Sequence, residues 1–130
     1  MGDNKNIYDD AMLAFSGSTA RYQIGMSSAK AEDSTGTVDT TCHIHTILFD
    51  GSQTGNANRL VYRRDKTPIT LTFTGTVGTT LNANSNILYV SQSSFPYNGF
   101  AMEIAIFNRA LTSTEINSLE NYFRSKWGTP

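Results

Sequence analysis

The chain has 130 residues, a length that fits one domain. Its 10 basic and 11 acidic residues give a formal net charge of −1, which argues against nucleic acid or an anionic membrane surface as a partner. No apolar run approaches the roughly 18 residues that span a bilayer, so membrane insertion is not expected. Cys42 is the only cysteine, so packing rather than an internal disulfide must hold the fold.

The first residues are polar and lack the apolar core of a secretory signal. We therefore expect residues 1–6 to be a flexible leader and residues 7–130 to be a single domain. No repeat or linker divides the rest of the chain.

Short apolar stretches alternate with Thr, Ser, Asn and Gly, which is typical of strands joined by turns. Ile69–Thr74 is the clearest strand, because its apolar residues and its threonines alternate. Near its end, His43–Phe49 is apolar on both faces, which predicts a central strand. We expect loops over 27–41 and 52–58. The other expected strands are Ala11–Phe15, Ala20–Met26, Arg59–Arg64, Ile87–Val90 and Met102–Phe107.

The chain ends in a predicted amphipathic helix. Thr112 and Glu115 have the spacing of a capping box, and Gly128 can end the helix. Its apolar residues form one stripe, with Glu120 expected mostly outside it. The stripe consists of Ile116, Leu119, Phe123 and Trp127. Together, the strand spacing and this helix predict an all-β fold, an antiparallel β-sandwich or barrel with one short C-terminal α-helix.

The C-terminal third also has a family pattern. Asn98-Gly99-Phe100, a strand that carries Glu103, the turn Phe107-Asn108-Arg109-Ala110-Leu111, the helix start Thr112-x-x-Glu115 and the ending Lys126-Trp127-Gly128 follow one another. This order resembles the closing segment of laminin-G-like domains in the concanavalin A-like lectin/glucanase superfamily. The resemblance covers about residues 43–128 and implies a jelly-roll sandwich.

Two features depart from that family. Arg63-Arg64-Asp65-Lys66 stands where the family usually has a Val-Asn-Gly or Val-Asp-Gly turn. Residues 7–42 supply fewer strands than the family's first half, so the sandwich is expected to be trimmed. A trimmed sandwich leaves an open edge, and natural proteins cover such edges, often by self-association. A homo-oligomer is therefore expected.

The superfamily includes glucanases, whose retaining members need two carboxylates about 5 Å apart. Glu103 stands alone in its predicted strand, so we expect no glycosidase activity and no enzyme. For Glu103 itself a structural role is expected, in which it bonds Arg109 or a backbone amide.

Two metal readings arise from the residues. His43 and His45 share a strand face but lack a third ligand, which favours one histidine hydrogen-bonded within the sandwich and the other facing water. The resemblance implies that calcium could bind oxygen atoms of Asp50, Asn56 and Asn58, or of Asp39. The competing reading makes Asp50 a turn former before Gly51.

Sugar recognition needs flat aromatic faces beside planar polar groups. Candidates for such a patch, if exposed, are Tyr62, Arg64, Tyr89, Gln92, Tyr97 and Asn98. The alternative is that these tyrosines are half-buried in the fold.

The sequence leads to two candidate functions. One is a non-catalytic recognition module for a glycan or a surface protein, extracellular or virion-associated. The other is an assembly module that acts through homo-oligomerisation without a small ligand.

Overall fold

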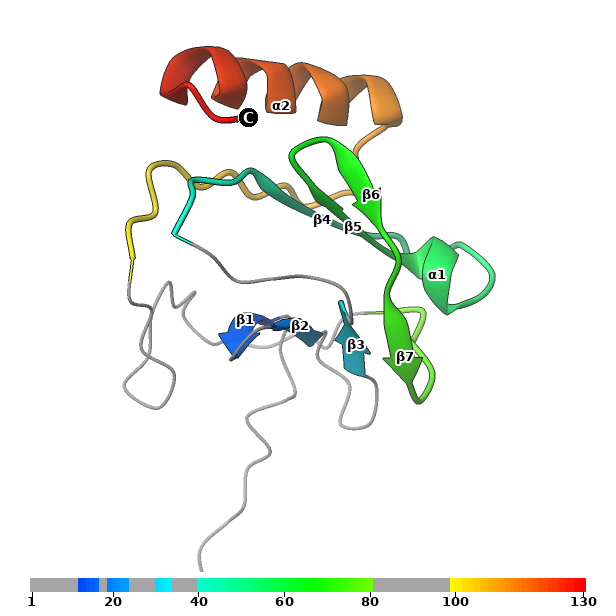
Figure 1. Cartoon of the computed structure of the whole chain (residues 1–130). Helices are drawn as coiled ribbons and strands as arrows, with labels where there is room; N and C mark the ends of the chain where they lie inside the picture. Colours follow the sequence, from blue (N-terminus) through cyan, green and yellow to red (C-terminus); the bar gives the residue numbers. More distant parts are fainter. Residues whose placement is uncertain (1–11, 17–18, 24–29, 34–39, 81–98) are drawn as a thin grey trace, which may run out of the picture.

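The computed structural model describes residues 12–16, 19–23, 30–33, 40–80 and 99–130 (Figure 1). These residues form two antiparallel sheets and a C-terminal helix. The predicted β-rich fold with one closing helix is therefore confirmed. The expected leader 1–6 and the expected strand Ile87–Val90 lie outside the described residues.

Sheet A has the strand order β1-β2-β3-β7, and sheet B has the order β4-β5-β6. Every pairing is antiparallel. The strands of sheet A are β1 (Met12–Ser16), β2 (Thr19–Gln23), β3 (Lys30–Glu32) and β7 (Thr72–Thr74). Sheet B consists of β4 (His45–Phe49), β5 (Leu60–Arg64) and β6 (Thr67–Ile69). The helices are α1 (Asn56–Arg59) and α2 (Ser113–Trp127).

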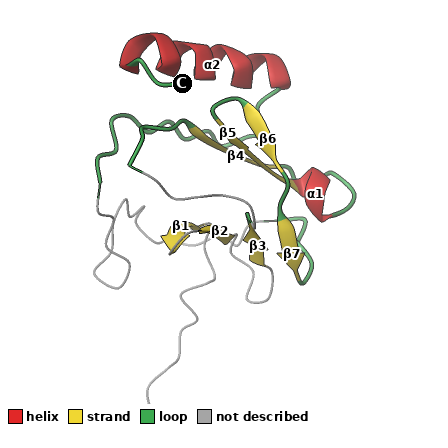
Figure 2. Cartoon of the chain, in the orientation of Figure 1, coloured by secondary structure: helices red, strands yellow, loops and turns green. Residues whose placement is uncertain are grey.

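The core lies where residues of the two sheets meet. Ala31 of β3, Leu60 and Tyr62 of β5, and Val77 after β7 form one buried cluster. Helix α2 lies on the side of sheet B that faces away from sheet A (Figures 1 and 2). Within the part of the chain that is described, no helix is long and apolar enough to cross a bilayer.

The predicted strand Ile69–Thr74 is divided between the two sheets. β6 pairs with β5 in sheet B, whereas β7 pairs with β3 in sheet A. Ile69, Leu71 and Phe73 nevertheless all pack against the same core cluster. Alternation fixes which side chains face the core, and a chain that crosses between two sheets around one core can keep it.

One expectation about a loop was wrong, and one about the place of a strand stays a prediction. β3 forms inside the predicted loop 27–41, although its three residues contain only Ala31 as an apolar residue and so carry no readable pattern. β4 was expected to be central; among the described strands it pairs with β5, which lies between β4 and β6. Thr46 of β4 bonds Glu120 of α2, and Phe49 packs against the core cluster, so β4 has contacts on both faces.

The predicted strand Met102–Phe107 is also wrong as to pairing. Residues 101–107 belong to no strand, and their side chains are exposed. Apolar alternation predicts an amphipathic extended segment, but hydrogen bonds to a neighbour make a strand.

Asp65 and Lys66 form the turn between β5 and β6. Both have positive φ, 51° and 69°, and Arg64 pairs with Thr67 across them. Positive φ at both central residues is the geometry of a two-residue type I′ hairpin, which glycine and asparagine usually supply. Asp65 also fastens the turn, because its carboxylate accepts from the Ile44 amide at 2.9 Å.

Helix α2 begins and ends as predicted. The Thr112 side chain accepts from the Glu115 amide, the Glu115 side chain accepts from the Thr112 amide, and Gly128 closes the helix with φ 64°. Ile116 of the apolar stripe is buried. Glu120 was expected outside the stripe but is 1% exposed, because it carries the polar attachment of α2 to sheet B.

Candidate functional site

A buried ion pair attaches α2 to sheet B and so positions everything the helix presents. Thr46 and Arg63 are cross-strand partners on β4 and β5. Thr46 Oγ1 donates to Glu120 Oε1 at 2.7 Å, and Arg63 Nη2 lies 2.9 Å from Glu120 Oε2. Arg63 Nη2 also donates to Asn117 Oδ1 at 2.9 Å. A carboxylate this deeply buried is tolerated only when it is paired. The pair therefore fixes the position of α2 on sheet B.

The segment 99–111 runs antiparallel to α2. Glu103 bonds Lys126 near the end of the helix, and Arg109 bonds Glu115 near its start. The 11 helical residues between these anchors span about 16 Å at 1.5 Å each. Six residues of the segment cover that length at about 2.7 Å per residue, which is less than the roughly 3.3 Å per residue of a β-strand.

Four side chains meet at the C-terminal end of α2, and we name them the helix-end cluster: Glu103, Tyr122, Lys126 and Trp127. Glu103 Oε2 accepts from Lys126 Nζ at 2.9 Å and from Trp127 Nε1 at 2.9 Å. Glu103 Oε1 accepts from Tyr122 Oη at 3.3 Å. Both rings are open to solvent, with Tyr122 46% and Trp127 39% exposed.

The charges of the helix-end cluster reinforce one another. Lys126 Nζ lies 5.2 Å from the centre of the Tyr122 ring and 5.1 Å from that of Trp127, within cation–π range. Hydrogen bonds to Tyr122 and Glu103 raise the pKa of Lys126. The bond from Lys126, and then that from Trp127, lowers the pKa of Glu103. The cluster therefore presents an ammonium and a carboxylate between two aromatic rings at neutral pH.

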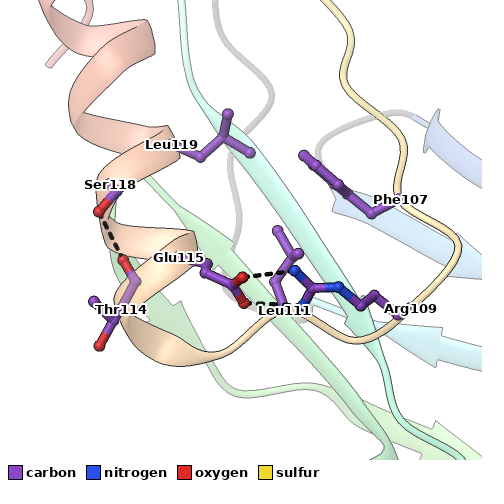
Figure 3. Close-up of a pocket in the computed structure, with 7 residues that line it drawn as sticks. All are labelled: Phe107, Arg109, Leu111, Thr114, Glu115, Ser118 and Leu119. Carbon is purple, nitrogen blue, oxygen red and sulfur yellow. Dashed lines mark hydrogen bonds and ion pairs between the residues drawn. The ribbon is translucent and has the colours of Figure 1, made fainter.

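A hollow of about 350 Å³ lies at the other end of the same face (Figure 3). Phe107, Leu111 and Leu119 give it apolar walls, and Thr114, Glu115, Ser118 and Arg109 line the rest. Glu115 meets Arg109 through two bonds of 3.0 and 2.6 Å. That contact, followed by bonds from Thr112, lowers the pKa of Glu115 to about 2. The rim of the hollow therefore carries two charges, and those of Glu115 and Arg109 neutralise each other.

The structure removes Tyr62 from the predicted sugar patch. Its side chain is 1% exposed, and its Oη bonds His45 Nδ1 at 2.8 Å. On the central strand β5, Tyr62 points into the core rather than outward. Arg64 is partly buried and pairs with His45 across the sheet. The other four predicted patch residues, Tyr89, Gln92, Tyr97 and Asn98, lie outside the described residues.

The residues proposed for calcium make hydrogen bonds within the fold, except Asp39, which lies outside the described residues. Asp50 accepts from the Ser52 amide, the Ser52 hydroxyl and Gln53, which is the turn-forming role and lowers its pKa. Asn56 bridges to the loop after β7, donating to Gly75 O and accepting from the Val77 amide. Asn58 donates to Thr54 O. These contacts favour the turn reading of Asp50 over a cation site.

The two histidines were expected to have one partner-bonded ring and one facing water. Instead both are partly buried and hydrogen-bonded. His43 Nδ1 lies 2.6 Å from Asp65 Oδ2, and His45 stacks on Tyr62. Among the residues the structure describes, no three His, Cys, Asp or Glu side chains gather as a metal site.

Sequence reasoning missed the helix-end cluster. Trp127 was assigned to the packing stripe, and Tyr122 and Lys126 were not considered as site residues. The readable signal was an i, i+4 pair of Tyr122 and Lys126 followed directly by Trp127. The partner Glu103 could not be found in this way, because it lies 23 residues from Lys126 in the chain. Its expected partner Arg109 bonds Glu115 instead.

Comparisons of the chain with protein-family models, with curated proteins and with solved structures gave no match. The laminin-G-like resemblance therefore rests on the motif residues alone.

Proposed function

We propose that the chain is a non-catalytic recognition module that binds carbohydrate at the helix-end cluster. The observation that carries this proposal is the pair of exposed rings, Tyr122 and Trp127, placed around the Glu103–Lys126 ion pair. The proposal replaces the patch around Tyr62, whose ring is buried.

The chemistry of the cluster suits a sugar. Pyranose C–H faces stack on aromatic rings, and hydroxyl groups both donate and accept hydrogen bonds. Glu103 offers acceptors, while Lys126 and the Trp127 N–H offer donors, so one hydroxyl could exchange bonds with several of them. Because the carboxylate and the ammonium are adjacent, their charges cancel, so the cluster does not favour a charged ligand over a neutral one.

The two carboxylates beside α2, Glu103 and Glu115, support a role in binding rather than in catalysis. Glu103 accepts hydrogen bonds from three neighbours, and Glu115 is held by Arg109 and the helix cap. Retaining glycosidases need one carboxyl group that keeps a proton near neutral pH, but the pKa of each of these two is lowered. An extracellular or virion-associated location accompanies this proposal through the laminin-G-like resemblance.

The test is a glycan-array screen of the wild type, followed by titration of any hit by calorimetry. Tyr122→Ala should weaken the hit by roughly tenfold or more, since stacked rings contribute strongly to recognition. The matched control is Phe100→Ala, which removes an equally large exposed ring outside the cluster. Equal affinity of Tyr122→Ala and the wild type would refute this site. Adding calcium or a chelator to the same titration tests the calcium expectation.

A second candidate function is assembly through homo-oligomerisation. The observation that favours it is the run of exposed apolar side chains on the segment 100–107. Contiguous exposed apolar surface typically marks an interaction site. Light-scattering mass at rising protein concentration distinguishes a module that self-associates from one that binds only a ligand.

A further inference from the structure

The hollow and the helix-end cluster lie in one row along α2. Residues three or four positions apart are neighbours on the surface of a helix. Ser118 and Leu119 line the hollow, and Tyr122 of the cluster follows them by four and three positions. Lys126 follows Tyr122 by four positions, and its Nζ lies 2.8 Å from the Tyr122 hydroxyl oxygen. The hollow and the cluster therefore adjoin at Tyr122.

The segment antiparallel to α2 forms the other side of this row. Glu103 holds the segment at the helix-end cluster, whereas Phe107 and Arg109 line the hollow. Three solvent-exposed rings are thereby distributed along the row: Phe107 is 49% exposed, Tyr122 46% and Trp127 39%. Rings placed at intervals can stack on successive units of a chain molecule.

The hollow also offers the polar groups that a sugar needs (Figure 3). A guanidinium has five N–H donors, and the bonds of Arg109 to Glu115 and to the Ala110 carbonyl engage at most three of them. The Thr114 hydroxyl is exposed, and the Ser118 hydroxyl, which donates to the Thr114 carbonyl, keeps its oxygen as an acceptor. Beside the aromatic wall, these donors and acceptors suit the hydroxyl groups of a pyranose unit.

The charges along the row cancel in pairs. Lys126 pairs with Glu103 at one end, and Arg109 pairs with Glu115 at the other. Paired charges give no net field that would select an anionic or a cationic chain, but each charged group still forms strong hydrogen bonds. The row therefore suits an uncharged chain that is rich in hydroxyl groups.

We infer that this row binds a linear, neutral oligosaccharide, with one sugar unit on the helix-end cluster and another in the hollow. The inference rests on the proposed function and adds the class and the length of the ligand. The helix rises by about 12 Å between Ser118 and Lys126, at 1.5 Å per residue. One pyranose ring is shorter than this, so only a chain of several units reaches both ends.

The first experiment measures how affinity depends on ligand length. The wild type is titrated by calorimetry with cello-, manno- and malto-oligosaccharides, each from the monosaccharide to the hexasaccharide. In at least one series the Kd should fall by roughly tenfold or more with length and then level off, once the chain spans both ends. Oligogalacturonides of the same lengths, which carry a carboxylate on each unit, should bind more weakly. Equal affinity for the monosaccharide and the hexasaccharide overturns the inference and leaves the proposed function standing.

The second experiment locates the far unit in the hollow. Phe107→Ala should weaken binding of the hexasaccharide by roughly tenfold and leave binding of the disaccharide unchanged, whereas Tyr122→Ala should weaken both. Ser118→Trp, which fills the hollow from the helix side, should act like Phe107→Ala. Phe100→Ala is the control, since it removes the same ring from the same segment outside the row, and circular dichroism checks that each variant keeps α2.

The outcomes separate the inference from the function on which it rests. If Phe107→Ala and Ser118→Trp changed neither ligand while Tyr122→Ala weakened both, the site would be the helix-end cluster alone. The inference would then be overturned and the proposed function kept. A glycan array whose hits are all charged or branched has the same meaning. An array with no hit overturns both.

Discussion

Helix α2 has two interfaces that both contain ion pairs. The ion pair in one interface is buried, and the ion pairs in the other are exposed to solvent. Toward sheet B, the Glu120 carboxylate meets Arg63 in an interface where the Glu120 side chain is 1% exposed. Toward the segment 99–111, Glu103 meets Lys126 and Glu115 meets Arg109, and the exposed fractions of these side chains run from 29 to 57%. All three pairs have closest N–O distances between 2.6 and 2.9 Å.

The difference shows that geometry alone does not decide what an ion pair does. A buried pair has lost its hydration, so each charge depends on the other. An exposed pair is screened by water and contributes little to stability, but its groups stay accessible to a ligand. The buried side of α2 therefore fixes the helix in place, and the exposed side is free to serve recognition.

The largest expected loss of stability comes from removing the buried ion pair between α2 and sheet B. Glu120→Ala leaves the Arg63 guanidinium, which is 16% exposed, without its carboxylate, and should lower the free energy of unfolding by about 3–5 kcal/mol. Chemical denaturation measures the loss. The matched variant is Glu103→Ala at the exposed pair, which should change stability far less. Equal losses in the two variants would contradict the comparison.

A smaller effect is expected at the helix start, where the exposed side begins. Thr112→Ala removes the acceptor of the Glu115 amide and should cost about 1 kcal/mol of stability. Ser118→Ala removes a comparable hydroxyl in the middle of α2, where it only bonds the Thr114 carbonyl. That control should stay within about 0.5 kcal/mol of the wild type. A larger loss in Ser118→Ala than in Thr112→Ala would show that the cap contributes little.

The same contrast explains what the sequence could predict. Local patterns predicted α2 with its capping box and glycine end, because every contact in these features lies within a few residues. The strands β4 and β5 were also predicted, since their apolar content is dense. Pairing was not predicted, because alternation at Ile69, Leu71 and Phe73 specifies a face but no partner strand.

The site was hardest to predict for the same reason. Burial of Tyr62 and Glu120 depends on which strand is central and where the helix docks, and both are long-range properties. The sequence left Tyr62 open between an exposed and a half-buried position, and it placed Glu120 outside the apolar stripe of the helix. The helix-end cluster joins Glu103 to residues 19–24 positions later, so no local motif contains it.

The exposed side should also give α2 a pH dependence. The pKa of Glu115 is lowered from 4.5 to about 2, first by Arg109 and then by Thr112. Its stabilising contribution is therefore complete above pH 4.5 and is lost as the pH falls from 4.5 toward 2. Glu115→Gln should lose less stability than the wild type over this window, which denaturation at several pH values measures. Parallel curves for the two proteins would contradict the role of Glu115.

The smallest effect on stability should come with a large effect on binding. Glu103→Gln keeps the size of the side chain and one acceptor oxygen, so stability should hardly change at an exposed pair. Sugar binding at the helix-end cluster should weaken, because the charged acceptor is lost and Lys126 loses its ionic partner. Glu115→Gln is the matched control, since it removes the same charge outside the cluster. If both variants bound sugar like the wild type while Tyr122→Ala did not, the rings alone would form the site and Glu103 would only position Trp127.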